Sequence, residues 1–154
     1  MQTPERVNPP AEDSARLARE LHGERLRLEA LLAAVPGVVW EAWGAPDKAS
    51  QRIDYVSEHV TEMLGYTVEE WLATPNFWLS IVHPDDRAEA ARVGAETFMA
   101  GGAPRTNRFR WLRKDGRAIW VESRAVAILD ASGRPIGMRG VNYDIGAQVA
   151  AEEQ

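Results

Sequence analysis

Residues 105–144 read RTNRFRWLRKDGRAIWVESRAVAILDASGRPIGMRGVNYD, and this stretch decides the fold class. It contains three predicted strands, over Arg105–Arg113, Ala118–Leu129 and Pro135–Asp144. They are separated by KDGR at residues 114–117 and by DASG at residues 130–133. The glycines of these connections supply the positive φ that tight hairpin turns need. Two consecutive hairpins predict a three-stranded antiparallel meander.

The sequence before the meander adds two strands, over residues 38–43 and 52–56, and several short helices. Ser57 is expected to cap the first short helix. Thr67-Val68-Glu69-Glu70 is a capping box that predicts the start of another. His83-Pro84-Asp85-Asp86 predicts a longer helix ending near Ala100, because proline and acidic residues favour a helix N-terminus. The strands and helices are segregated along the chain, which indicates the α+β class.

Residues 15–35 form a predicted helix, which Pro36-Gly37 ends. Leu17, Leu21, Leu28 and Leu31 follow the alternating 4/3 spacing of a heptad, in which Glu24 is the polar member. This leucine stripe packs either on its own domain or against a second copy in a coiled coil, since so short a helix needs a partner surface. Residues 1–14 contain three prolines and are expected to be a disordered lead-in. Residues 146–154 are expected to begin a C-terminal linker helix.

The composition of the 154-residue chain excludes several classes of function. It has no cysteine, which rules out disulfides, Cys-zinc sites and a thiol nucleophile. The formal net charge of -5 argues against nucleic acid as a partner. The basic strip over residues 105–117 is interpreted as a solvated hairpin with cross-strand pairs, for example to Glu122. No run of 18 apolar residues and no signal peptide is visible, so no membrane insertion and a cytoplasmic location are expected.

The order and spacing of short motifs resemble the PAS domain family, in particular its sensory-box variety, from Leu31 to about Ala147. The resemblance implies a five-stranded antiparallel sheet of order 2-1-5-4-3 over residues 36–145, with short helices on one face. It also implies a bacterial signal-transduction module that relays to a histidine kinase or diguanylate cyclase domain outside this chain. The matching motifs are Tyr55-Val56-Ser57, Leu64-Gly65-Tyr66-Thr67, Glu69-Glu70-Trp71, Trp78, Ile81-Val82-His83-Pro84-Asp85-Asp86-Arg87, Arg108-Phe109-Arg110-Trp111, Arg113-Lys114-Asp115-Gly116, Trp120-Val121, Asp130 with Gly133, Gly140-Val141 and Asp144-Ile145.

The resemblance further implies a cavity between the sheet and the helices. Phe109 and Trp111 share one side of their strand, and the number of large rings favours a filled core. The alternative is a pocket for a metabolite or a flavin, in which Arg110 would reach an anionic ligand. The expected lining residues are Trp40, Trp78, Ile81, Phe109, Arg110 and Trp111.

The end of the last strand is expected to relay the signal. In the family, Asp144-Ile145 would begin the linker to the output domain. The family usually has Thr or Ser at the next position, and Gly146 would make this joint more flexible.

No catalytic or metal-binding set of residues is evident. His83, Asp85 and Asp86 are not interpreted as a metal or acid–base site, because helix capping accounts for both carboxylates and for Pro84. Haem-binding relatives carry their axial histidine on the long helix, which here has no histidine after its first turn. Photoactive flavin-binding relatives use a cysteine, which this chain lacks. The sequence therefore predicts a regulatory module that is not an enzyme and that homodimerises through the leucine stripe and the outer face of the sheet, with a small-molecule sensor as the alternative.

Overall fold

The computed structural model describes residues 3–4, 10–46 and 51–154. The chain divides into two compact units, residues 1–34 and residues 35–154. They are described separately, the first as a helix and the second as a sheet covered by helices.

The first unit consists of helix α1, Ala11–Ala33. It begins four residues earlier than predicted, so the last part of the expected lead-in is helical. Glu12 and Asp13 lie in its first turn, where acidic side chains stabilise the free N–H groups and the positive end of the helix dipole. Of the remaining lead-in, residues 1–2 and 5–9 lie outside the described residues.

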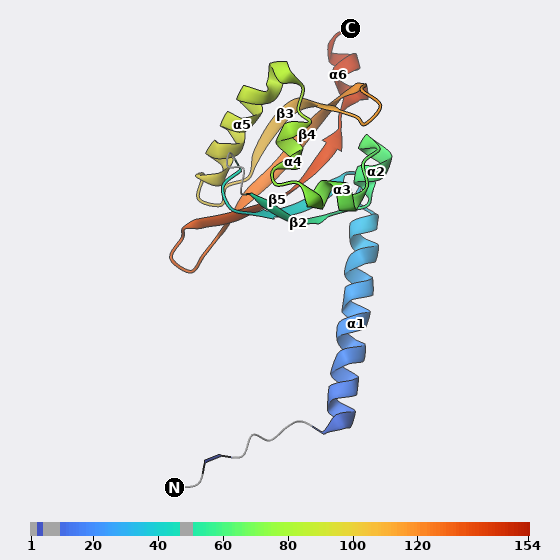
Figure 1. Ribbon diagram of the computed structural model, residues 1–154, viewed down its shortest axis with the longest axis vertical. Coiled ribbons are helices and arrows are strands. Elements are labelled where there is room, and N and C mark those ends of the chain that lie inside the picture. Colours follow the sequence, from blue (N-terminus) through green and yellow to red (C-terminus); the bar gives the residue numbers. More distant parts are fainter. Residues whose placement is uncertain (1–2, 5–9, 47–50) are drawn as a thin grey trace. The chain divides into compact units, whose positions relative to one another are not determined.

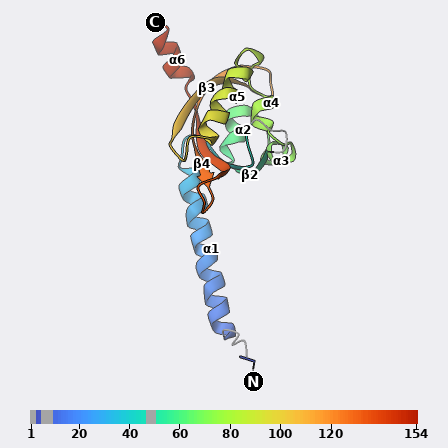
Figure 2. The same cartoon turned by 90° about the vertical axis from the view of Figure 1, so that its left-hand side faces the viewer.

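The second unit is a five-stranded antiparallel sheet, and the predicted order β2-β1-β5-β4-β3 is confirmed. Helices α2 to α5 lie on one face of this sheet (Figures 1 and 2). The strands are β1 Val38–Trp43, β2 Arg52–Val56, β3 Arg105–Leu112, β4 Ala118–Leu129 and β5 Pro135–Asp144. The helices are α2 His59–Leu64, α3 Val68–Ala73, α4 Phe77–Ser80, α5 Pro84–Phe98 and α6 Gly146–Glu152.

The two predicted hairpins join β3 to β4 and β4 to β5. Gly116 and Gly133 have φ of 90° and 86°, a region that side chains beyond glycine rarely adopt. In the second turn the Asp130 carboxylate accepts hydrogen bonds from the backbone N–H groups of Ser132 and Arg134, both at 2.9 Å. The turn residues therefore fix the register of the meander.

The predicted cap by Thr67 is present, and the predicted helix start at Pro84 is capped by the preceding histidine, which was not predicted to cap it. The Thr67 hydroxyl accepts from the Glu70 N–H at 3.0 Å, and His83 Nδ1 accepts from the Asp85 N–H at 3.1 Å. The expected cap by Ser57 is wrong. Its hydroxyl accepts from the Val39 N–H at 2.9 Å instead, and so joins the start of α2 to β1.

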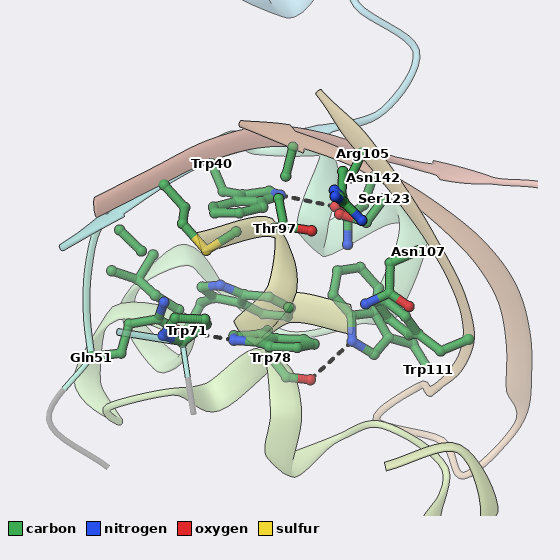
Figure 3. A pocket seen from close by; sticks show the side chains of 17 residues that line it. Trp40, Gln51, Trp71, Trp78, Thr97, Arg105, Asn107, Trp111, Ser123 and Asn142 are labelled. Atoms are coloured by element: carbon green, nitrogen blue, oxygen red, sulfur yellow. Dashed lines mark hydrogen bonds between the residues drawn. The ribbon is translucent and has the colours of Figure 1, made fainter. Parts of the chain in front are cut away.

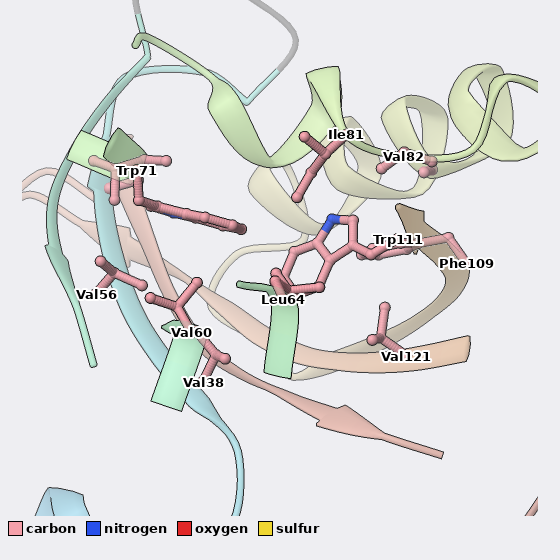
Figure 4. Packing of buried hydrophobic residues seen from close by; sticks show 13 residues of the cluster. Val38, Val56, Val60, Leu64, Trp71, Ile81, Val82, Phe109, Trp111 and Val121 are labelled. Carbon is pink, nitrogen blue, oxygen red and sulfur yellow. The ribbon is translucent and has the colours of Figure 1, made fainter. Parts of the chain in front are cut away.

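The hydrophobic core lies between the inner face of the sheet and the helices (Figure 4). Its largest fully buried side chains are Trp71, Trp111, Phe109 and Leu64. Trp111 meets Trp71 and Phe109 edge-on, with ring centroids 5.3 and 5.5 Å apart. Edge-to-face contacts of this kind stabilise a core by about 0.5–1.5 kcal/mol each beyond the burial of area.

Candidate functional site

An interior cavity of about 40 Å³ lies between the inner sheet face and the helices (Figure 3). A volume of this size holds about three water molecules. Four tryptophans line it: Trp40 from β1, Trp71 from α3, Trp78 from α4 and Trp111 from β3. The core is therefore largely filled by rings, but a small space remains among them.

Glycines in the wall let the rings approach the backbone. Gly140 of β5 lies directly opposite Trp40. A methyl group at this position would come within 2.9 Å of the Trp40 ring and 2.6 Å of the Arg124 carbonyl oxygen. Only glycine allows Trp40 to lie across β5 at this distance.

Four of the six residues predicted to line the cavity do so: Trp40, Trp78, Phe109 and Trp111. Ile81 is buried in the core next to the cavity but does not line it. The placement of Arg110 in the cavity is wrong. Successive residues of a strand point to opposite faces, so Arg110 faces away from Phe109 and Trp111.

Arg110 instead forms a two-point ion pair with Asp86 at the start of α5. Its Nε and Nη2 donate to the two carboxylate oxygens at 2.8 Å each, and its backbone N–H donates at 2.9 Å. The guanidinium also lies 5.3 Å from the centre of the Trp120 ring. These hydrogen bonds from Arg110 hold the pKa of Asp86 below its ordinary value. Asp86 therefore ties α5 to the edge strand β3 in addition to facing the helix N-terminus.

The cavity also has buried polar residues that were not predicted. Trp78 Nε1 donates to Gln51 Oε1 at 3.0 Å, and Trp40 Nε1 donates to Asn142 Oδ1 at 2.8 Å. Gln51 and Asn142 are only 1% and 3% exposed. A buried amide requires hydrogen-bond partners, and the indole N–H groups satisfy one atom of each. Asn142 could have been found from the sequence, because it lies at an inward-facing position of its predicted strand.

The expected relay residues lie where β5 leads into α6. Ile145 is buried, and its N–H donates to the Trp120 carbonyl oxygen at 3.0 Å. The Asp144 carboxylate accepts from the Gly146 N–H at 2.8 Å and so shapes the first turn of α6. Asp144 and Ile145 therefore join the end of β5 to the start of α6.

An arginine joins α6 to the outer face of the sheet. Arg108 of β3 donates to Glu122 of β4 at 3.2 Å and to Glu152 of α6 at 3.2 Å. Burial raises the pKa of Glu122, but hydrogen bonds from Arg108 and Arg124 lower it by more. This confirms the cross-strand pair between the basic strip and Glu122.

The leucine stripe lies on α1, in the first unit. Leu17, Leu21, Leu28 and Leu31 are 54%, 73%, 57% and 58% exposed, and no residue of α1 is buried. Such a row of exposed leucines is unusual for a helix that has no further partner.

The described residues contain no cluster of three His, Asp or Glu side chains placed to hold a metal. Within the same part of the chain, no helix is both long and apolar enough to span a membrane.

A protein-family model described as the PAS fold matches residues 53–142. The chain belongs to this family. The match covers most of the sheet unit and all the cavity-lining residues from Ile53 to Asn142, whereas Trp40, Ala42, Pro46 and Gln51 lie before it.

Solved structures share this fold. The N-terminal domain of a diguanylate cyclase with PAS/PAC sensor from Marinobacter aquaeolei is 18% identical, with a TM-score of 0.64 over 73% of this chain and 98% of that chain. The PAS domain of an HTR-like protein from Haloarcula marismortui is 21% identical, with a TM-score of 0.64 over 85% and 99%. A sensory box histidine kinase/response regulator from Burkholderia thailandensis is 20% identical, with a TM-score of 0.61 over 82% and 90%.

The curated relatives are much longer proteins. A methyl sulfide methyltransferase-associated sensor from Methanosarcina acetivorans is 31% identical over 101 residues, which are 66% of this chain and 10% of that protein. An uncharacterised protein of Sinorhizobium fredii is 28% identical over 145 residues, 93% of this chain and 16% of that protein. The chain thus spans 10% and 16% of the length of these two relatives.

Proposed function

We propose that this chain is a non-catalytic signalling module that forms a parallel homodimer through α1 and relays a conformational change through α6 to an output domain. The observation that carries the proposal is the leucine stripe, whose four side chains are each more than half exposed. Burying an exposed leucine contributes about 1.5–3 kcal/mol of favourable free energy, so packing the stripe against a second copy would stabilise a dimer.

The charges beside the stripe favour a second copy in parallel orientation. In the heptad, Leu21 and Leu28 take position a, and Leu17 and Leu31 take position d. Glu20 then takes position g. In a parallel pair this position faces position e of the partner one heptad further on, which is Arg25. Two-fold symmetry gives two such Glu–Arg pairs.

The junction at the end of β5 supports the relay. Arg108 bonds to Glu152, and the Ile145 N–H bonds to Trp120, so α6 is joined to the sheet at both of its ends. The outputs we propose are a histidine kinase or a diguanylate cyclase, because two of the fold's solved neighbours have those names.

The test replaces Leu21 and Leu28 together by glutamate and measures the molar mass by sedimentation equilibrium at micromolar concentration. The expected result is a dimer for the wild type and a monomer for the double variant. Leu26→Glu is the matched control, because Leu26 is 52% exposed on the same helix but takes position f, outside the stripe. A dimer that survives the double substitution would contradict the proposal.

A second candidate function is binding of a small molecule in the interior cavity. The observation that favours it is the pair of buried amides, Gln51 and Asn142, in the wall of a cavity with room for about three waters. Each amide uses its oxygen to accept from a tryptophan, which leaves its NH₂ donors available. A cavity of this size does not hold a flavin, so native mass spectrometry is expected to show any bound mass to be small.

A further inference from the structure

A row of three polar residues crosses the inner face of the sheet at one end of the cavity. Asn107 of β3 is the direct register partner of Ser123 of β4, and Ser123 is the direct partner of Asn142 of β5. All three line the cavity. We name them the polar row. Ser123 and Asn142 are buried, and Asn107 is half-buried.

The polar row has unused hydrogen-bonding groups. Asn142 accepts from Trp40 through Oδ1, which leaves its NH₂ group as a donor. Asn107 donates to the Ala90 carbonyl oxygen at 3.1 Å, which leaves its Oδ1 as an acceptor. The Ser123 hydroxyl has no hydrogen bond to another residue in the described part of the chain.

Three of the four tryptophans that line the cavity already donate their indole N–H within the protein and are not donors to a bound molecule. The indole N–H of Trp40 binds Asn142, that of Trp78 binds Gln51, and that of Trp111 donates to the Trp78 carbonyl oxygen at 3.0 Å. Their rings form an apolar wall, and the polar row forms the polar end.

The electrostatics of this end favour an anion. Arg105 lines the cavity and lies two residues before Asn107 on β3, so both side chains belong to the same face. Figure 3 shows Arg105, Asn142 and Ser123 together at one end, with Gln51 at the other. Arg105 forms no ion pair with any described residue, and no described residue lining the cavity is acidic. Among the described residues, the lining of the cavity therefore contains one cation and no anion.

We propose that this end of the cavity binds a short-chain monocarboxylate. Its carboxylate would accept hydrogen bonds from the NH₂ group of Asn142, the hydroxyl of Ser123 and the guanidinium of Arg105, and its alkyl part would lie against the tryptophans. The size follows from the cavity, since room for about three waters admits a molecule of acetate or propionate size. This assignment rests on the second candidate function, the binding of a small molecule in the cavity.

Arg105 decides between an acid and a neutral molecule of the same shape. Burial of a carboxylate is costly unless a cation and hydrogen bonds compensate for the lost water. A neutral amide such as acetamide needs no cation. Arg105 is therefore expected to increase the affinity for acetate and to leave that for acetamide unchanged.

The test titrates the full chain with sodium acetate and with acetamide at constant ionic strength. The side-chain amide resonances of Asn142 and the indole resonance of Trp40 are followed by ¹H–¹⁵N NMR. The wild type is expected to bind acetate at least tenfold more tightly than acetamide. Arg105→Gln should lower the affinity for acetate at least tenfold and leave that for acetamide unchanged. Arg105 is exposed, so this variant is expected to fold.

Arg134→Gln is the matched control, since Arg134 is exposed in the β4–β5 turn and does not line the cavity. Its affinity for acetate should equal that of the wild type. Equal binding of acetate and acetamide, or an acetate affinity unchanged in Arg105→Gln, overturns the carboxylate proposal and leaves the cavity as a binding site. If neither compound shifts the resonances of Asn142 and Trp40, the carboxylate proposal and the proposed binding of a small molecule in the cavity are both overturned.

Discussion

The leucines of α1 and the tryptophans of the sheet unit are two apolar sets with opposite surroundings. Leu21 is 73% exposed, whereas Trp111 is 1% exposed and contacts two other aromatic rings. The four tryptophans that line the cavity, Trp40, Trp71, Trp78 and Trp111, pack within one chain between the sheet and the helices. The leucines have no such enclosure within their own helix. We therefore expect the first set to determine whether the sheet unit folds, and under the proposed function the second set determines whether the chain associates.

The largest expected effect is that of Trp111→Ala. The substitution removes a buried indole, its two edge-on ring contacts and its hydrogen bond to Trp78. It should lower the free energy of unfolding by about 3–5 kcal/mol, measured by urea denaturation followed by circular dichroism. Leu26→Ala, in the exposed set, should change it by less than about 0.5 kcal/mol. Similar losses in the two variants would remove the distinction between the sets.

Asp86→Asn is expected to have a smaller effect on the sheet unit. The pKa of Asp86 is lowered by Arg110, so the ionised carboxylate stabilises the folded state. The loss of this charged pair should cost about 1–3 kcal/mol at pH 7. The contribution is complete above the ordinary Asp pKa of about 3.9 and is lost as the pH falls through the lower pKa of the folded state. The difference between wild type and variant in urea denaturation should therefore shrink below about pH 4. A difference that grows there would contradict the role of the ion pair.

Glu24→Leu changes only the exposed set. Glu24 takes position d of the heptad, where a parallel dimer would place it beside its own copy. Replacing two like charges by two leucines should tighten the dimer about tenfold or more, measured as the dissociation constant in sedimentation equilibrium. The thermal unfolding of the sheet unit should not change. A dissociation constant that stays the same or rises would place the interface elsewhere.

Much of the fold followed from local sequence signals. The Asp-Gly and Ser-Gly turns and the strand-forming runs predicted β4 and β5 at their observed bounds. The start of α1 was missed because the segment after Pro10 is rich in acidic residues, which fit a polar lead-in as well as a first helical turn. Local pattern alone does not separate these two cases.

The cavity was harder to predict because it depends on pairing between distant strands. Asn107, Ser123 and Asn142 come from three strands, and only the register shows that they are neighbours. Each lies at an inward-facing position of its strand, where the alternation predicts an apolar residue. A polar residue at such a position was the available sequence signal for the cavity. The same alternation would have excluded Arg110, which is out of phase with Phe109 and Trp111.

The most direct test of dimerisation through the leucine stripe is disulfide cross-linking. The chain has no cysteine, so an introduced thiol is the only one that can form a disulfide. Leu28→Cys places a single thiol at position a, where the two copies of a parallel coiled coil come together, whereas Leu26→Cys places it at position f on the outside. Mild oxidation at micromolar concentration, followed by non-reducing electrophoresis, should convert most of the Leu28→Cys variant to covalent dimer and leave the Leu26→Cys variant monomeric. Equal cross-linking of the two variants, or none in either, would contradict dimerisation through the leucine stripe.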